Sequence, residues 1–351
     1  MGSVKDLQVI VKPTKDSMGI GRFHFSDRYS IFDWGEMPDY IEGKGVALCL
    51  MGAYCFEKLE EKDIKSRYRG LINERNIPAF VDELEKPTRI MEFDLVNVLR
   101  PRVLKQKGNL TYDYSMFTSN LCNCLIPLEI IYRNGLPSGS SIFRRLERGS
   151  ISIEDLGLNH YPRKGEKLVK PILDVSTKLE KKDRYIKWEE AQRIAGLTDG
   201  ELNDIRTLLI KVDETITHVA SKAGLKNEDG KIELAFDLER RPLIVDVVGT
   251  LDECRFTYNG LHVSKEMARR FYRKTTWYRD IEEAKRDAGK EGIEDWKQQC
   301  ESNPPKLDQA LKEILSKIYL AAANEFIGRR FFDVPSLSEV VKEYRNCMIT
   351  V

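Results

Sequence analysis

Polar and apolar residues alternate in short runs along the first third of the chain. Phe23 and Phe25, for example, stand on either side of His24. This period of two places successive side chains on opposite faces of a β-strand. Together with two longer runs of apolar and β-branched residues, the alternation predicts four strands, at residues 7–12, 22–26, 91–99 and 125–132.

The clearest helix is expected in the second half of the chain. Thr198 and Glu201 have the spacing of a capping box, in which each side chain satisfies a free backbone N–H group at a helix start. Apolar residues then recur at helical spacing, at positions 202, 205, 208, 209, 212, 216, 219 and 220. Gly224 is a favourable residue for the end of this helix. An apolar run at residues 46–59 predicts a second, buried helix.

The last quarter of the chain is charged and has a helical pattern from Lys265 onward. An apolar stripe follows Pro304 and Pro305, at positions 311, 314, 315, 318, 322 and 326. Ser336 and Glu339 form a second capping box. This stripe predicts helices that pack against the rest of the molecule.

These elements indicate an α+β fold. We expect an antiparallel layer in residues 1–124, a larger mixed α+β part in residues 125–264, and a helical C-terminal extension in residues 265–351.

The charge balance and the apolar runs exclude two classes of partner. The 351 residues include 57 Lys and Arg and 56 Asp and Glu, so no basic excess indicates nucleic-acid binding. The longest apolar stretch, at residues 45–56, is shorter than the roughly 20 residues of a membrane-spanning helix. We therefore expect a cytoplasmic protein, with the C-terminal helices as the surface of a possible homo-oligomer.

Two carboxylates are candidates for a metal site. The patterns of residues 231–237 and 242–249 predict antiparallel strands joined by a short loop. Lys231 and Glu233 share one face of the first strand, and Asp246 interrupts an apolar run, where a charge needs a partner. Such a pair suits Mg²⁺, which takes one or two carboxylates together with phosphate oxygens and water. The alternative is a solvated hairpin with ordinary surface charges.

A strand that runs into a glycine- and serine-rich loop is a candidate anion site. Arg133 follows the apolar run, and Gly135 and Gly139 allow backbone N–H groups to approach an anion closely. A guanidinium binds phosphate through two parallel hydrogen bonds, although a structural ion pair is the alternative for Arg133. The sequence contains no Walker loop, Rossmann fingerprint or zinc-protease motif. These patterns alone lead only to Mg²⁺-dependent phosphate chemistry.

Seven short segments of the chain are each similar to a motif of one enzyme family, and they follow one another in the same order as in that family. They lie at residues 2–7, 26–33, 43–45, 126–140, 176–180, 229–233 and 246–256. Gly43-Lys44-Gly45, for example, matches the family's Gly-Lys-Gly, and Ser176-Thr-Lys-Leu-Glu180 is similar to its Ser-Thr-Lys-Ala-Glu. On these segments the chain resembles the SAICAR synthetase family, and the helical part past residue 275 has no counterpart in the resemblance.

The resemblance implies an ATP- and Mg²⁺-dependent ligase of de novo purine biosynthesis. Such an enzyme joins L-aspartate to the carboxylate of the aminoimidazole ribonucleotide CAIR through an acyl phosphate. It releases the succinocarboxamide SAICAR, ADP and phosphate. The implied fold has the outline of kinases and ATP-grasp enzymes, with ATP held by residues 1–124 and substrate and metal by residues 125–264. The alternatives are another ATP-dependent small-molecule kinase or ligase, and a non-catalytic nucleotide-binding relative.

The resemblance also implies roles for residues at matching positions. The expected contacts of ATP are Gly2, Ser3, Val4, Lys5, Cys124, Leu125, Lys231 and Glu233. The expected contacts of the ribonucleotide are Asp33, Lys44, Arg133, Ser138, Ser140 and Arg255. The expected metal ligands are Glu233 and Asp246, and the expected catalytic residues are Lys178, Lys231 and Asp252.

The chain departs from the family pattern at some of these positions. Ser3 stands where the family has lysine, and Val247 stands where it often has glutamate. One phosphate contact and a third metal carboxylate are therefore left open. Either Ser138 or Ser140 is the expected phosphate ligand of the loop.

Overall fold

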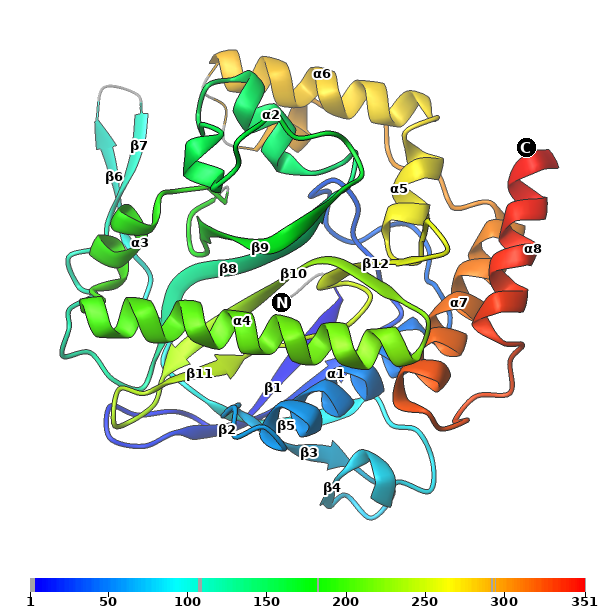
Figure 1. Cartoon of the computed structure of the whole chain (residues 1–351), viewed down its shortest axis with the longest axis horizontal. Helices are drawn as coiled ribbons and strands as arrows, with labels where there is room; N and C mark the ends of the chain where they lie inside the picture. The colour runs from blue at the N-terminus through cyan, green and yellow to red at the C-terminus, as the bar shows by residue number, and fades with distance from the viewer. Residues whose placement is uncertain (1–3, 107–108, 182, 292, 294, 351) are drawn as a thin grey trace.

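Two antiparallel β-sheets, a β-hairpin and eight α-helices make up the described part of the chain. It is a computed structural model that describes residues 4–106, 109–181, 183–291, 293 and 295–350 (Figure 1). The first sheet has the strand order β1 (Lys5–Val11), β2 (Gly19–Phe25), β5 (Ile90–Leu95), β3 (Tyr68–Ile72) and β4 (Pro78–Ala79). The second has the order β13 (Leu261–His262), β12 (Cys254–Tyr258), β10 (Lys226–Phe236), β8 (Cys124–Leu136) and β9 (Glu166–Thr177), with β11 (Pro242–Val245) also paired to β10. The hairpin of β6 (Arg102–Gln106) and β7 (Asn109–Asp113) projects from the body of the molecule (Figure 1).

The helices are distributed along the whole chain. They are α1 (Lys44–Glu60), α2 (Ser141–Glu147), α3 (Trp188–Ala195), α4 (Asp199–Lys222), α5 (Glu266–Tyr272), α6 (Thr276–Glu291), α7 (Gln309–Ile327) and α8 (Leu337–Thr350). Short 3₁₀ turns lie at η1 (Val81–Glu83), η2 (Glu154–Leu156) and η3 (Trp296–Gln299). The α+β class and the helical C-terminal part are as predicted.

The long helix α4 confirms the prediction made from its capping box. The Glu201 backbone N–H donates to the Thr198 hydroxyl over 3.2 Å, and the Glu201 carboxylate accepts from the Thr198 N–H over 2.8 Å. The apolar side of the helix is buried against β10 and β8. The helix gives way to Gly224, whose φ of 67° lies in the left-handed region that suits glycine.

The two sheets are joined at two places and share one core. The Arg67 N–H donates to the Ile244 carbonyl over 3.0 Å, which ties the approach to β3 to β11. At the start of β8 the Leu125 N–H donates to the Asn97 carbonyl over 2.9 Å. One hydrophobic cluster contains side chains from all three predicted segments, for example Phe25, Ile130 and Tyr344. The division of the chain at residues 124 and 264 stays a prediction.

Two predicted strands are too long. The run at residues 91–99 forms β5 only as far as Leu95. The run at residues 242–249 reads as continuous strand, but β11 ends at Val245. Asp246 has a φ of 59°, in the left-handed region, and turns the chain out of the sheet. The turn directs the Asp246 carboxylate away from an otherwise apolar segment. Asp246 therefore ends β11 and also contributes to the site.

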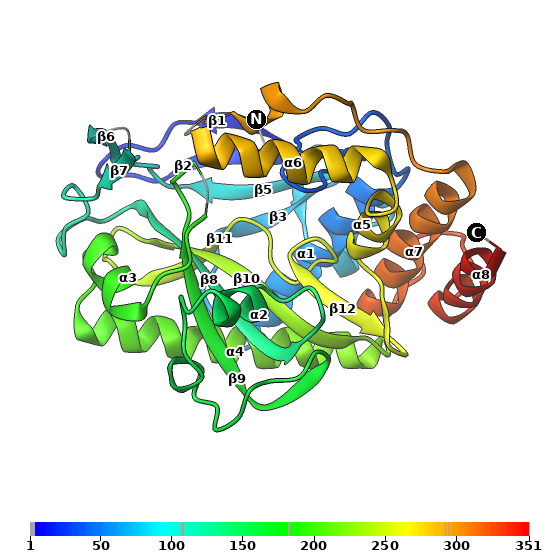
Figure 2. The same ribbon diagram turned by 90° about the horizontal axis from the view of Figure 1, so that it is seen from above.

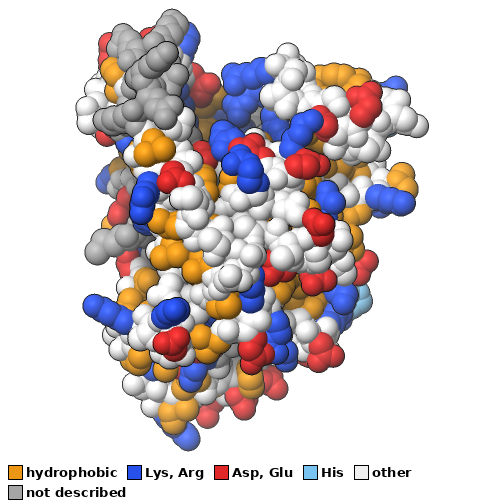
Figure 3. Space-filling model, turned by 90° about the vertical axis from the view of Figure 1, so that its left-hand side faces the viewer, with side chains coloured by type: hydrophobic (Ala, Val, Ile, Leu, Met, Phe, Trp, Pro, Cys, Tyr) orange, Lys and Arg blue, Asp and Glu red, His pale blue; other side chains and the backbone are white. Residues whose placement is uncertain are grey.

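The C-terminal helices and the surface agree with the remaining patterns. The Glu339 N–H donates to the Ser336 hydroxyl over 3.3 Å, and the Glu339 carboxylate accepts from the Ser336 N–H over 2.9 Å, as the second capping box predicts. None of the described helices is long and apolar enough to cross a membrane. On the face in Figure 3, basic and acidic side chains are interspersed.

Candidate active site

The polar side chains expected to do chemistry lie on one face of the second sheet. Helix α4 packs on its other face, and Figure 2 shows α4 and β1 on opposite sides of β8 and β10. In the antiparallel register, Glu233 of β10 is opposite Glu129 of β8, and Asp229 is opposite Arg133. Side chains two residues apart share a face, so Lys231 lies between Asp229 and Glu233 on that face.

Three lysines and four carboxylates gather where β1 meets this face. We call them the lysine–carboxylate cluster, which consists of Lys5, Lys178, Lys231, Glu129, Glu233, Asp246 and Glu253. The Lys178 ammonium lies 2.6 Å from Glu233 and 3.0 Å from Glu129. One cation therefore bridges two carboxylates that stand side by side on adjacent strands, where like charges repel.

The other two lysines of the cluster extend it across the sheets. Lys231 lies 2.8 Å from a carboxylate oxygen of Glu129 and 3.6 Å from one of Glu253. Lys5, on β1, forms an ion pair with Asp246. This ion pair connects the first sheet to the turn after β11, so the cluster is built from both sheets.

Burial and neighbouring charges shift the pKa values of the two predicted metal ligands in opposite directions. Burial, with the nearby charge of Asp246, raises the pKa of Glu233 to about 7. Burial alone would also raise the pKa of Asp246, but the charge of Lys5 and its hydrogen bond outweigh burial and hold that pKa below its usual value. The two carboxylates repel each other, which is the electrostatic setting that a bound cation relieves.

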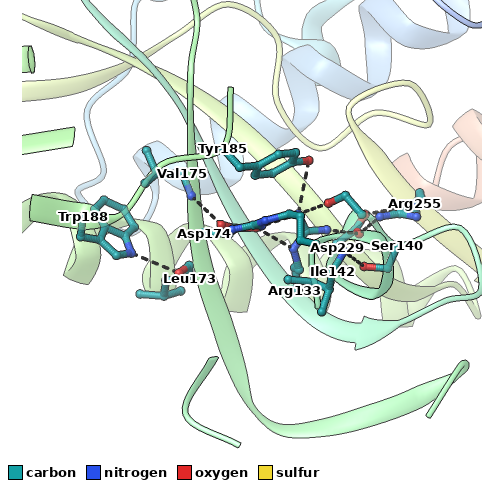
Figure 4. A network of polar contacts seen from close by, with 12 residues as sticks. Arg133, Ser140, Ile142, Leu173, Asp174, Val175, Tyr185, Trp188, Asp229 and Arg255 are labelled. Atoms are coloured by element: carbon teal, nitrogen blue, oxygen red, sulfur yellow. Dashed lines mark hydrogen bonds and ion pairs between the residues drawn. The ribbon is translucent and has the colours of Figure 1, made fainter. Parts of the chain in front are cut away.

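Three arginines share two aspartates farther along the same face. This arginine–aspartate cluster consists of Arg133, Arg145, Arg255, Asp174 and Asp229, of which Figure 4 labels all but Arg145. Arg133 is only 2% exposed and lies 2.9 Å from Asp174 and 3.5 Å from Asp229. Arg145 also binds Asp174, over 2.6 Å, and Arg255 binds Asp229, over 2.8 Å. The cluster therefore carries one positive charge in excess, which suits an anion.

The serines of the following loop have different surroundings. The Ser140 hydroxyl is buried and caps α2 by accepting from the Ile142 N–H over 3.5 Å. Ser138 is exposed. The Ser141 hydroxyl, which the sequence patterns did not single out, accepts from Arg133 over 3.2 Å and lines the adjoining cavity.

A cavity of about 360 Å³ opens between the two clusters. Its lining includes five predicted site residues, namely Asp33, Arg133, Lys231, Asp252 and Arg255. Lys265, which precedes α5, and Arg269, in the middle of α5, line it as well and were not predicted. The structure thus brings residues that lie far apart in the sequence together around one cavity.

Asp252 and Lys44 form a deeply buried ion pair of the site. The Lys44 ammonium, which is 0% exposed, lies 2.7 Å from one carboxylate oxygen of Asp252. The Tyr319 hydroxyl of α7 donates to the other oxygen over 2.8 Å. Burial disfavours the carboxylate, but the charges of Lys44 and Lys265 outweigh burial and lower the pKa of Asp252 to about 2. Asp252 lines the cavity, whereas Lys44 lies behind it.

The residues expected to contact ATP are described only in part. Gly2 and Ser3 lie outside the described residues. The Val4 carbonyl accepts from the Ser26 N–H over 3.1 Å, which anchors the start of β1. Cys124 is 2% exposed and belongs to the main core.

Strand β1 also carries exposed apolar side chains, whereas Leu125 on the second sheet is buried. Leu125 packs with Val245 in a small separate cluster. Leu7 and Val9 share the face of β1 that carries Lys5, and they are 50% and 46% exposed.

The position where the family often has a third acid is part of the core. Val247 is buried and packs so closely that a Cβ at Gly52 would lie 2.8 Å from it. Among the described residues no group of three or more histidines, cysteines or acids has metal-binding geometry. Glu233 and Asp246 are two carboxylates, a donor set that fits Mg²⁺ when phosphate oxygens and water complete its coordination.

Comparison with known proteins places the chain in a family. The family model described as SAICAR synthetase matches residues 12–290. The chain belongs to the SAICAR synthetase family. Members of this family use ATP to ligate L-aspartate to CAIR in purine biosynthesis, and this is the reaction of the chain.

Similar proteins of known sequence carry the name of this reaction. A putative phosphoribosylaminoimidazole-succinocarboxamide synthase of Archaeoglobus fulgidus is 49% identical over 348 residues, covering 99% of this chain and 100% of the relative. The Thermoplasma acidophilum synthase is 36% identical over 270 residues, which are 75% of this chain and 81% of the relative. Both are SAICAR synthetases by name, which agrees with the family match.

Solved SAICAR synthetases share the fold. The SAICAR synthase of Saccharomyces cerevisiae, complexed with SAICAR, aligns with a TM-score of 0.62 and 18% identity, over 94% of each chain. A SAICAR synthetase in complex with ADP aligns with a TM-score of 0.54 and 18% identity, over 88% of this chain and 99% of that one.

Proposed function

We propose that the chain makes SAICAR at the cavity between its two clusters. The ATP phosphates would lie at the lysine–carboxylate cluster and the ribonucleotide phosphate at the arginine–aspartate cluster. The observation that carries the proposal is the single polar sheet face, on which Lys231 belongs to the first cluster and also lines the cavity.

The nucleotide half of the site supports ATP in two ways. Lys5 reaches from β1 to the carboxylates. It is placed to bind phosphate oxygens when ATP replaces Asp246 as the partner of its ammonium group. Leu7 and Val9 offer the exposed apolar surface for the adenine ring, with Leu125 on the second sheet. Removal of that surface from water favours nucleotide binding.

Glu233 and Asp246 are the residues that would hold Mg²⁺. The ion supplies Lewis-acid charge neutralisation at the transferred phosphoryl group. Each of the two carboxylates now has a lysine partner, Lys178 for Glu233 and Lys5 for Asp246. These lysines become available for phosphate oxygens once a metal ion binds the carboxylates.

The ribonucleotide half depends on the excess positive charge of the arginine–aspartate cluster. Arg133 is buried and pairs with both Asp174 and Asp229, as in a structural ion pair. Its charge also contributes to the positive electrostatic potential of the cluster. Arg255 is partly exposed and lines the cavity. Together with the Ser141 hydroxyl it is placed to bind the 5′-phosphate.

The reaction consists of two displacements. A carboxylate oxygen of CAIR attacks the γ-phosphorus of ATP, the bond to ADP breaks, and an acyl phosphate forms. The aspartate amine then attacks the acyl carbon, the bond to phosphate breaks, and the nitrogen loses a proton. Such transfers depend on positioning and on stabilisation of charge.

Lys178 and Lys231 are suited to stabilise that charge. Burial lowers the pKa of each ammonium, but for Lys178 the carboxylates of Glu233 and Glu129 outweigh burial, and the net pKa is raised. The pKa of Lys231 is raised in the same way, chiefly by Glu253 and Glu129. Both side chains stay protonated at neutral pH and can offset the negative charge on the phosphoryl group.

The test is ADP release by the purified protein with ATP, Mg²⁺, CAIR and L-aspartate, with each omitted in turn. We expect release that needs all four, with SAICAR forming in equal amount. Release that does not need aspartate would indicate a kinase or a ligase with another amine. ATP binding without any release would indicate a non-catalytic relative.

A further inference from the structure

We infer that α6 and α7 complete the ribonucleotide pocket, because Lys285 and Tyr319 position two of the acidic residues that line it, Asp33 and Asp252. The inference rests on the proposed function in taking this pocket as the site of CAIR. Neither Lys285 nor Tyr319 lines the cavity, so both are positioning residues.

The first observation concerns the backbone at Asp33. Phe32 and Asp33 are consecutive non-glycine residues with φ values of 54° and 64°. This left-handed conformation is unfavourable for residues with a Cβ, and it persists only where the surroundings hold it. Asp33 lines the cavity, so the turn determines how its carboxylate is presented.

Lys285 of α6 holds this turn directly. Its ammonium donates to the Phe32 carbonyl over 2.9 Å and to the Asp33 carboxylate over 3.3 Å. The Asp33 side chain is 89% exposed even with this contact. One cation from the C-terminal part of the chain therefore binds both the backbone and the side chain of the turn.

Aromatic packing fixes Lys285 and the turn against α6. The Phe32 ring lies 4.8 Å from the ring of Tyr278, between centroids. The Lys285 ammonium lies over the ring of Trp296 at 4.8 Å. Trp34, one residue after Asp33, packs edge-on against Trp277 with centroids 5.5 Å apart. The turn thus has partners from both α6 and η3.

The second observation concerns Asp252. One of its carboxylate oxygens pairs with Lys44 and the other accepts from Tyr319. Tyr319 is 1% exposed and comes from α7. With both oxygens engaged, the plane of the carboxylate is fixed. Helix α7 lies beyond residue 290, where the match to the family model ends, so the family match does not imply this contact.

The experiment compares two positioning variants with two matched controls. Lys285→Met removes the two hydrogen bonds of the ammonium and Tyr319→Phe removes one hydrogen bond, and both keep the approximate size of the side chain. Lys317→Met removes an exposed ion pair between α7 and α8, and Tyr344→Phe removes a buried hydroxyl of α8. KM is measured for ATP and for CAIR in the full-length protein, and the dissociation constant of CAIR is measured by calorimetry without ATP.

We expect the two positioning variants to raise both CAIR constants about tenfold and to change KM for ATP less than twofold. Lys285→Arg should restore most of the CAIR affinity, because it retains the cation. The two controls should match the unmodified protein.

Equal effects on ATP and CAIR, or CAIR constants no different from those of the controls, would overturn the inference while the ligase assignment stood. If the unmodified protein neither bound nor turned over CAIR, the proposed function itself would fail. Should Lys285→Met not fold, the milder Tyr319→Phe and Lys285→Arg variants decide the question by the same constants.

Discussion

Replacement of Lys44 by methionine should remove the cation from its buried ion pair with Asp252. The pKa of Asp252 is about 2, compared with an ordinary value of 3.8. Since one pKa unit corresponds to about 1.36 kcal/mol, the difference is worth about 2.5 kcal/mol of stability. Without Lys44 the same carboxylate would stay buried with less compensation. We therefore expect a loss of about 3–5 kcal/mol in the free energy of unfolding at pH 7.

The loss should have a distinct pH dependence. The folded-state pKa of Asp252 is depressed, so its contribution is present above the unfolded pKa near 3.8 and is lost as the pH falls towards 2. In Lys44→Met the carboxylate becomes easier to protonate, since burial is then opposed by fewer charges. The difference in the free energy of unfolding between the unmodified protein and Lys44→Met should therefore become smaller as the pH is lowered from 7.5 to 4.5.

Urea denaturation followed by tryptophan fluorescence measures both quantities. Lys58→Met is the matched control, because Lys58 is also on α1 but forms a partly exposed pair with Glu61, and such pairs contribute at most about 1 kcal/mol. A Lys44→Met loss below about 1 kcal/mol, or a gap that does not change with pH, would refute the reasoning. The double variant with Asp252→Asn should lose less than the sum of the two single variants.

Three further predictions concern other parts of the molecule. Burial raises the pKa of Glu57 to about 7, so its ionisation destabilises the folded state increasingly between about pH 4.5 and 7. Glu57→Gln should therefore raise the free energy of unfolding by about 1–2 kcal/mol at pH 8 and leave it nearly unchanged at pH 4.5. Urea denaturation at the two pH values measures this difference. Asp246→Asn should leave the thermal transition within a few degrees and reduce Mg²⁺-dependent ADP release at least a hundredfold. Arg133→Lys should raise KM for CAIR at least tenfold and KM for ATP less than twofold, because an ammonium cannot reproduce the fork of a guanidinium.

Each of these predictions has an outcome that contradicts it. Glutamine can accept from Tyr68 and Val81 through the one oxygen that Glu57 now uses, so destabilisation at pH 8 would show that the charge of Glu57 is favourable. Full turnover by a folded Asp246→Asn protein would remove this residue from the metal site. Equal changes in both KM values for Arg133→Lys would separate this arginine from the ribonucleotide.

Local patterns were sufficient to predict the elements whose stability is local. The capping box at Thr198 and the apolar face after it predicted α4, because a helix start and a helix face are written in residues three or four apart. Strand β9 was not predicted, since Pro171 and the charges around it disguise the alternation of an edge strand. The end of β11 was missed because left-handed backbone at Asp246 leaves no periodic signal.

The site was predictable where a charge interrupts an apolar run. That rule singled out Asp246, and it applies equally to Glu129, which stands between Leu128 and Ile130 in β8 and was overlooked. Tyr319 could not have been found in this way, because a tyrosine in the buried stripe of a helix is usually a packing residue. Only the fold shows that its hydroxyl meets Asp252.

The balance of charge in the lysine–carboxylate cluster has a consequence for how the binding of ATP and the binding of Mg²⁺ affect each other. Four carboxylates and three ammonium groups neutralise one another almost completely before any ligand arrives. ATP alone would meet the surplus carboxylate charge, and Mg²⁺ alone would leave lysines without partners. Each ligand repairs the imbalance that the other creates, so we expect ATP and Mg²⁺ to enhance one another's affinity by the same factor, as thermodynamic linkage requires. Before binding, the protein groups act as mutual counterions in the places that the metal ion and the phosphates later occupy.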